Sequence, residues 1–314
     1  MNIKFSDALR VLISSHTGRA GLTLLSFLVV ISIWVLVTYP MDFGTKEWSN
    51  PSVWADNPKA VPPKWLNLLP GSDRVVHSVL DSDTPKDTRT VGQIKEETYR
   101  LRISHNFDDF PTFISFTLND VEFLERPPLI TLSLVRPDST IVRLLHHVPS
   151  GARDNEVAPI TRYKQTPFRV LLTADQTVRA ALANFHNSQY GTDYDERDLR
   201  NLSDQAAFGL PIPGDQAAFD LLQGDYEFVV EATFTNAEDR LEATKIVVGG
   251  DVFGGMGTDS QGRDLAVGLL FGFPVALFIG LLASTLITTI GASLGIVSGY
   301  VGGWVDTIIQ RLSD

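Results

Sequence analysis

The chain contains no cysteine among its 314 residues. This absence excludes disulfide bonds, thiol nucleophiles and cysteine-ligated metal sites, so a domain outside the cytoplasm must rely on its own hydrophobic core. The sequence also lacks the His-Glu-x-x-His pattern of metalloproteases and the glycine-rich loop that binds phosphates. We therefore expect a protein that is not an enzyme and carries no cofactor.

Charged side chains are absent from two long stretches, residues 20–41 and 265–305. Nearly all charges lie between them, where residues 42–250 contain 31 Asp and Glu against 21 Lys and Arg. A nucleic-acid-binding surface needs basic side chains to neutralise phosphates, so this acidic section argues against a nucleic-acid partner. The separation indicates one polar domain flanked by segments that suit a lipid bilayer.

The first apolar run, residues 20–39, has the length of a transmembrane helix, because the hydrocarbon core of a bilayer takes about 20 residues. Trp34 and Tyr39 lie toward its far end, where such rings favour the headgroup layer, and Pro40 is expected to stop the helix. A cleaved signal peptide is the alternative. The length of the apolar core and the lack of a small-residue cleavage site favour an uncleaved transmembrane helix.

Residues 1–19 are expected to form a cytoplasmic tail, because three basic side chains there are opposed only by Asp7. These basic residues are Lys4, Arg10 and Arg19. Residues 41–250 then form an extracytoplasmic domain. Its first part is rich in proline and contains Trp48, Trp54 and Trp65, which predicts an extended strap whose indoles pack onto the domain or onto the membrane surface. A binding surface for a partner or for lipid headgroups is the alternative interpretation.

Alternation of apolar and polar residues predicts strands at residues 99–104, 112–118, 129–135, 140–145, 168–173, 226–235 and 241–248. Polar turns at residues 136–139 and 236–240 separate neighbouring strands. The intervening residues 174–223 are predicted to be more helical, particularly at 174–187 and 215–223. The expected fold is a membrane protein with α-helical transmembrane segments and a large extracytoplasmic, mainly-β, sandwich-like domain with a helical insert.

Two groups of histidines could suggest a metal site. His105 lies near Asp108 and Asp109, and His146 is followed by His147. Neither group has the spacing of a known zinc motif, and adjacent residues on a strand point to opposite faces. We therefore expect solvated or hydrogen-bonded histidines and no metal site.

The second uncharged run is too long for a single span of about 20 residues. We expect a signature turn and membrane-surface helix at residues 251–274, ending near Phe273 and Pro274, and a second transmembrane helix at residues 275–298. This second helix carries small residues that would let another helix approach closely. They include Gly280, Ser284, Gly291 and Gly295. Such a stripe favours a multi-helix transporter over a simple anchor.

Two motifs flank this second transmembrane helix. The first reads Gly257-Thr258-Asp259-Ser260-Gln261-Gly262-Arg263-Asp264, and the second reads Gly299-Tyr300-Val301-Gly302-Gly303-Trp304-Val305-Asp306. In the first motif, Thr258 and Asp259 can bond the following backbone amides, and Gly262 permits a positive φ. Arg263 can pair with Asp259 or Asp264, or lie along the lipid headgroups. We expect Asp264 to cap the following helix. A calcium ion held by the two carboxylates is the alternative, but it needs more oxygen ligands.

Together the motifs resemble the start of the core in permease subunits of the oligopeptide, dipeptide and nickel ABC importers. The resemblance covers about the last sixth of the chain. It implies a binding-protein-dependent importer for peptides or similar small solutes, driven by ATP hydrolysis on separate subunits. It also implies a multi-pass protein of the cell membrane with a cytoplasmic N-terminus.

The partners implied by the resemblance are a second permease subunit, ABC ATPase subunits, an extracytoplasmic solute-binding protein and the lipid bilayer. Residues 299–314 would be a cytoplasmic turn and the start of a third helix. The family's Glu-Ala-Ala loop, which docks onto the ATPase, is absent from the sequence, so we expect a truncated or split permease subunit. The alternative function is a membrane-anchored receptor or adhesion protein with an extracellular β-sandwich binding domain.

Overall fold

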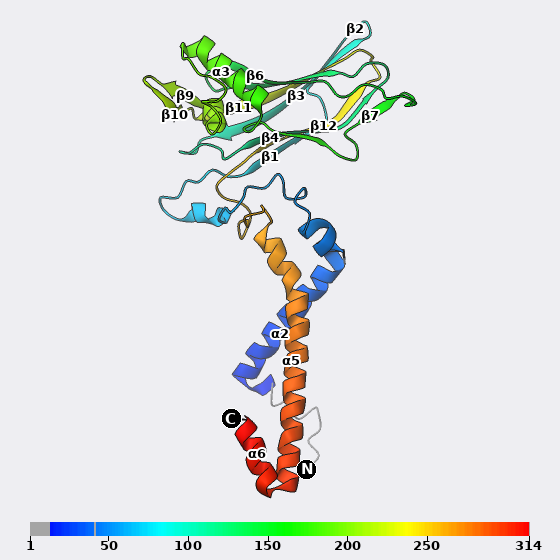
Figure 1. Cartoon of the computed structure of the whole chain (residues 1–314), viewed down its shortest axis with the longest axis vertical. Coiled ribbons are helices and arrows are strands. Elements are labelled where there is room, and N and C mark those ends of the chain that lie inside the picture. The colour runs from blue at the N-terminus through cyan, green and yellow to red at the C-terminus, as the bar shows by residue number, and fades with distance from the viewer. Residues whose placement is uncertain (1–12, 41, 314) are drawn as a thin grey trace. The chain divides into compact units, whose positions relative to one another are not determined.

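The computed structural model describes residues 13–40 and 42–313, and the chain divides into two compact units (Figure 1). The helical unit comprises Met1–Val53 and Leu265–Asp314, and the β unit comprises Trp54–Asp264. The β unit therefore begins and ends later than the predicted domain at residues 41–250. Most of the expected cytoplasmic tail, residues 1–19, lies outside the described residues.

Helix α2 (His16–Thr38) has 23 residues and includes all of the predicted apolar helix at 20–39 except Tyr39, its C-cap. Ser15 caps its start, because the Ser15 hydroxyl accepts a hydrogen bond from the Gly18 amide at 3.5 Å. The helix ends just before Pro40, as expected for a residue that cannot continue the backbone ladder. A short π-helix, η1 (Gly44–Trp48), follows.

Helix α5 (Leu265–Val301) is one continuous helix of 37 residues, and the predicted division into a surface helix and a separate span is wrong. Pro274 lies inside it. The proline removes one backbone donor, but the apolar residues on both sides keep their helical hydrogen bonds and sustain the helix. At 1.5 Å per residue, α5 is about 55 Å long. Both α2 and α5 are long and apolar enough to cross a membrane.

Aromatic side chains pack the first turns of α5 against the segment that follows α2. The ring centroids of Tyr39 and Phe43 are 4.9 Å apart, and those of Phe43 and Phe271 are 5.2 Å apart. A Cβ atom added to Gly268 would lie 2.4 Å from the Trp48 ring. Glycine at this position therefore lets the indole lie directly against α5.

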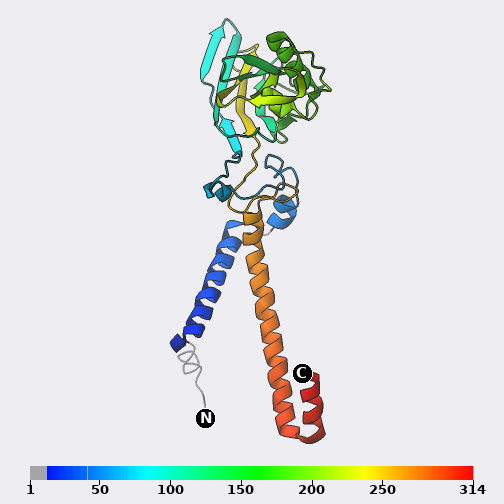
Figure 2. The same cartoon turned by 90° about the vertical axis from the view of Figure 1, so that its left-hand side faces the viewer.

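The β unit contains two five-stranded antiparallel sheets (Figure 2). The strands of the first sheet are β1 (Ser78–Ser82), β12 (Arg240–Val248), β4 (Ile114–Phe123), β7 (Ile160–Arg162) and β8 (Phe168–Leu171), with β7 and β8 both paired to β4. The strands of the second, in order, are β2 (Asp87–Val91), β3 (Ile94–His105), β11 (Gly224–Phe234), β5 (Leu129–Val135) and β6 (Ile141–His147). All seven predicted strands are present in these sheets.

The two sheets share one hydrophobic core, which is the arrangement of a β-sandwich. Phe116 and Leu118 of β4 and Leu132 and Phe228 of the second sheet are fully buried in it. The predicted turn at residues 236–240 joins strands of different sheets, since β11 and β12 are not paired with each other. The carboxylate of Asp239 fixes this crossing by accepting a hydrogen bond from the Leu124 amide at 2.9 Å.

The insert between β8 and β11 is only partly helical. Helices α3 (Gln176–Tyr190) and α4 (Ser203–Phe208) are present, and α3 confirms the helix predicted at 174–187. The helix predicted at 215–223 is wrong, because those residues lie mainly in strand β10 (Asp215–Leu221), which pairs with β9 (Gly209–Ile212). The Pro213–Gly214 turn, with Gly214 at φ 88°, reverses the chain, and hairpin pairing overrides the helix preference of alanine.

Candidate functional site

The first motif folds into a closed loop at the end of the β unit. Its carboxylate at Asp259 accepts hydrogen bonds from the backbone amides of Gln261 and Arg263 at 2.9 and 3.0 Å. The Arg263 guanidinium pairs with the same carboxylate at 2.7 Å, which is one of the two predicted pairings. Burial acts to raise the pKa of Asp259, but these bonds from Arg263 and Gln261 together hold it below its ordinary value.

Thr258 fastens this loop to the proline- and tryptophan-rich segment that precedes the sheets. Its side chain is buried, donating to the Pro58 carbonyl at 2.8 Å and accepting from the Val61 amide at 3.2 Å. The Thr258 amide in turn donates to the Val61 carbonyl at 2.9 Å. We call residues 54–65 and 254–264, which these and further backbone bonds join, the clasp.

Two glycines of the motif are required by the geometry of the clasp. Gly257 has φ 78°, and a Cβ atom there would lie 2.3 Å from the Val61 carbonyl oxygen. Gly262 has φ 82°, confirming the predicted positive φ, and its carbonyl accepts from the Asn57 side chain at 2.9 Å. Residues with a Cβ atom disfavour a positive φ, and at position 257 the Cβ would also collide with the Val61 carbonyl oxygen. The motif therefore needs glycine at these positions.

The end of the motif leads directly into α5. Asp264 forms an antiparallel bridge with Thr258 and occupies the position before Leu265, the first residue of the helix. The cap predicted for Asp264 remains a prediction. The motif thus closes the clasp and sets the point at which the chain leaves the β unit.

The second motif forms a sharp turn between α5 and α6 (Gly303–Ser313). Gly302 and Gly303 have φ 62° and 60°, and the Gly302 amide donates to the Ser298 carbonyl at 3.0 Å. The Ser298 hydroxyl also bonds the Asp306 carboxylate across the turn. Gly299 lies in the last turn of α5, and the Tyr300 side chain beside it is almost fully exposed. The motif is therefore a helix–turn–helix connection held by Ser298 and Asp306.

The predicted stripe of small residues lies on the surface of α5. Apart from the helix's own neighbouring backbone, no heavy atom of the described residues lies within 4 Å of a Cβ built on Gly280, Gly291 or Gly295, and Ser284 is exposed. Packing of another helix on these residues remains a prediction. Gly291-Ala292-Ser293-Leu294-Gly295 also matches the Gly-x-Ser-x-Gly pattern, but Ser293 lies inside a continuous helix. A nucleophile elbow needs a sharp strand-to-helix turn, so this serine is not one.

The histidines occupy separate environments. His105 is buried and bonds the Asp109 carbonyl at 2.8 Å, while His146 is exposed and bonds the Thr131 hydroxyl at 3.2 Å. His147 stacks on an aromatic ring, and burial lowers the pKa of both His105 and His147. Within residues 13–40 and 42–313, no group of three or more His, Cys, Asp or Glu is arranged to hold a metal ion.

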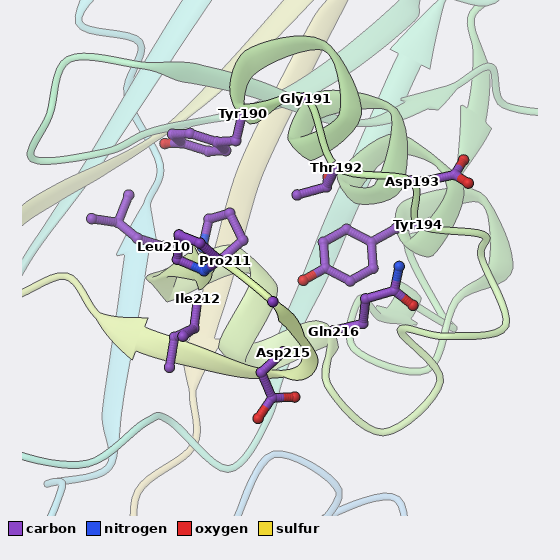
Figure 3. A pocket seen from close by; sticks show the side chains of 12 residues that line it. Tyr190, Gly191, Thr192, Asp193, Tyr194, Leu210, Pro211, Ile212, Asp215 and Gln216 are labelled. Atoms are coloured by element: carbon purple, nitrogen blue, oxygen red, sulfur yellow. The ribbon is translucent and has the colours of Figure 1, made fainter.

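Sequence reasoning missed an open pocket of about 950 Å³ in the insert of the β unit (Figure 3). It lies between the end of α3 and the β9–β10 hairpin and is lined by residues 190–194 and 210–216. The rings of Tyr190 and Tyr194 face it, whereas the carboxylates of Asp193 and Asp215 point away (Figure 3). No sequence motif marks it, because its walls come from two segments brought together by the hairpin.

Comparison with protein-family models finds no match, and comparison with curated proteins finds none either.

Proposed function

We propose that this chain is a permease component of an ATP-driven ABC importer for peptides or similar small solutes. In this proposal α2 and α5 cross the cell membrane, with the N-terminus in the cytoplasm and the β unit on the extracytoplasmic side. A second permease subunit would complete the translocation pathway. ABC ATPase subunits would drive it, and an extracytoplasmic solute-binding protein would deliver the solute.

The observation that carries the proposal is the position of the two motifs on α5. The first motif ends at Asp264, directly before the helix, and the second contains its last residues and the turn at Gly302–Gly303. A helix that only anchors a domain needs about 20 apolar residues, and α5 is longer than that. Such an anchor would need neither of the two motifs. Both motifs in the order and spacing of the importer permeases therefore favour transport over simple anchoring.

The orientation follows from the charges at the ends of α2. Arg19 lies in its first turns, after the basic residues of the tail, whereas its last turn has no basic residue. Basic residues are retained on the cytoplasmic side, so α2 would run outward and α5 would return inward. This placement puts the β unit outside and the α5–α6 turn inside.

Single-cysteine variants test the orientation, because the native chain offers no competing thiol. Ala152→Cys lies in an exposed loop of the β unit and Arg311→Cys in exposed α6. A membrane-impermeant maleimide applied to intact cells should label the first variant and should label the second only after permeabilisation. Labelling of both variants in intact cells would contradict the proposed topology.

The transport role is tested by purifying the tagged full chain from membranes of its own host. We expect a second permease, which would carry the Glu-Ala-Ala loop that this chain lacks, to co-purify in fixed stoichiometry together with an ABC ATPase. A solute-binding protein should stimulate the ATP hydrolysis of this assembly. The Gly302→Val and Gly303→Val variants, which disfavour the positive φ of the turn, should weaken this assembly. Recovery of the native chain without any ATPase would contradict the proposal.

A membrane-anchored receptor is the second candidate, because the pocket of Figure 3 offers the β unit a place to bind a small ligand. A receptor would bind its ligand through this pocket without any ATPase. Replacing Tyr194 by alanine should then abolish ligand binding, while assembly with ATPase subunits would not occur in either form.

A further inference from the structure

Four large apolar side chains of the β unit are exposed close to the clasp. Trp65 is 52% exposed, Leu68 85%, Leu69 52% and Met256 46%. Trp65 and Leu68 belong to the short helix η2 (Lys64–Leu68), the small light-blue coil of Figure 1. We call these four residues the apolar rim. Exposed apolar groups of this size, gathered at one place, indicate an interaction surface.

The clasp holds the rim in a fixed arrangement. The Trp65 indole N–H donates to the Gly255 carbonyl at 3.1 Å, next to Met256. The Lys64 amide donates to the Gly254 carbonyl at 3.0 Å. These bonds hold the segment of Trp65 and Leu68 beside the segment of Met256, which is far from it in sequence. Trp65 keeps its ring exposed while its polar group is satisfied.

The segment that carries Trp65, Leu68 and Leu69 differs in charge from the chain as a whole. The whole chain has a net charge of −11, yet residues 57–72 contain two lysines and no Asp or Glu. Both lysines, Lys59 and Lys64, are exposed. Tryptophan and leucine next to lysine suit the boundary of a bilayer, where the rings and aliphatic chains enter the headgroup layer and the ammonium groups meet lipid phosphates.

The chain also limits how far the rim can lie from a bilayer that α5 enters. Met256 precedes Leu265, the first residue of α5, by nine residues, and the clasp ties η2 to the same short connection. We infer that the apolar rim binds the headgroup layer of the outer leaflet and so holds the β unit at the membrane surface. This inference rests on the membrane placement of α5 in the proposed function and does not depend on transport.

Three single-cysteine variants of the cysteine-free full chain test this inference. Leu68→Cys reports on the rim. Val157→Cys is the matched solvent control, because Val157 is an apolar residue of the β unit that is 86% exposed. Ile287→Cys, in α5 and 72% exposed, reports whether the helix is in lipid. Each variant is labelled with an environment-sensitive fluorophore and reconstituted in vesicles of phosphatidylcholine and phosphatidylglycerol.

Two quenchers then locate each label. Phosphatidylcholine that carries a headgroup spin label should quench the fluorophore at position 68 strongly, and aqueous iodide should quench it much less than in detergent without lipid. The label at position 157 should show the opposite pattern, and a spin label deep in the acyl chains should quench position 287.

The outcomes separate the two proposals. If position 287 is quenched in the acyl region but position 68 behaves like position 157, the rim inference is overturned and the membrane placement stands. Shielding of position 68 from both quenchers would also overturn it, since a protein surface would then cover the rim. If position 287 is open to iodide, the membrane placement of α5 fails first.

Discussion

Replacing Thr258 by valine is expected to loosen the clasp while keeping the shape of the side chain. The hydroxyl makes two buried hydrogen bonds, to the Pro58 carbonyl at 2.8 Å and from the Val61 amide at 3.2 Å. A buried polar group that loses its partner costs about 1–3 kcal/mol, so the two together predict a destabilisation of about 2–6 kcal/mol. Thr258→Ser keeps the hydroxyl and should lose much less.

Two measurements on the purified full chain check this prediction. The apparent unfolding temperature of the β unit should fall in Thr258→Val, by about 4–24 °C if each kcal/mol shifts it by about 2–4 °C. Hydrogen exchange of residues 57–65 should become faster, while exchange in β4 stays slow. Thr88→Val, on an exposed strand, is the matched control and should change stability by less than about 0.5 kcal/mol. Equal exchange in native and Thr258→Val chains would refute the role assigned to the hydroxyl.

Three further changes have expected outcomes. Gly257→Ala should lower the unfolding free energy by about 2 kcal/mol or more, because position 257 has φ 78° and the new Cβ would collide with the Val61 carbonyl oxygen. Gly255→Ala, where the Cβ would meet open space, should be nearly neutral. Equal melting temperatures of the two variants would contradict this. Gly268→Ala should displace the Trp48 indole and shift the tryptophan fluorescence, whereas Gly272→Ala on the same helix should not. Matching spectra of the two variants would argue against the contact between Gly268 and Trp48. Burial lowers the pKa of His186 from 6.5 to about 4 in the folded chain. Burial of this ring therefore carries no protonation penalty above pH 6.5, and the free energy of unfolding falls as the pH drops from 6.5 toward 4, because the unfolded chain takes up the proton first. The His186→Gln chain should therefore lose less stability over that interval, and parallel pH–stability curves would count against this.

Periodicity in the sequence predicted most of the β-sandwich. Strands such as β5 and β11 alternate buried and exposed residues or form short apolar runs, so local pattern located them closely. The failure at β10 shows the limit of local pattern. Asp215–Leu221 has helix-forming alanines, but the Pro-Gly turn and the partner strand decide its conformation. Strands β1 and β2, each at the edge of a different sheet, carry too few apolar residues to be recognised in the sequence.

The motif residues were recognisable in the sequence, but their contacts were not. Glycine at position 262 predicted a positive φ, and Arg263 was predicted to pair with Asp259 or Asp264, of which the structure shows the pair with Asp259. Nothing local indicated that Thr258 bonds a segment roughly two hundred residues earlier in the chain. The pocket of Figure 3 was also missed, and of the apolar rim only Trp65 was singled out in the sequence, because each joins segments distant in sequence.

The sequence by itself determined the two long uncharged runs, the acidic character of the section between them and the two glycine-rich turns. These features depend on residue type and spacing over a few turns of chain, which is the range of helix and turn propensities. Only the tertiary structure decided that α5 continues through Pro274, that β11 and β12 lie in different sheets, and that the first motif closes a clasp. Each of these depends on hydrogen bonds or packing between groups whose distance is set by the fold and not by their separation along the chain.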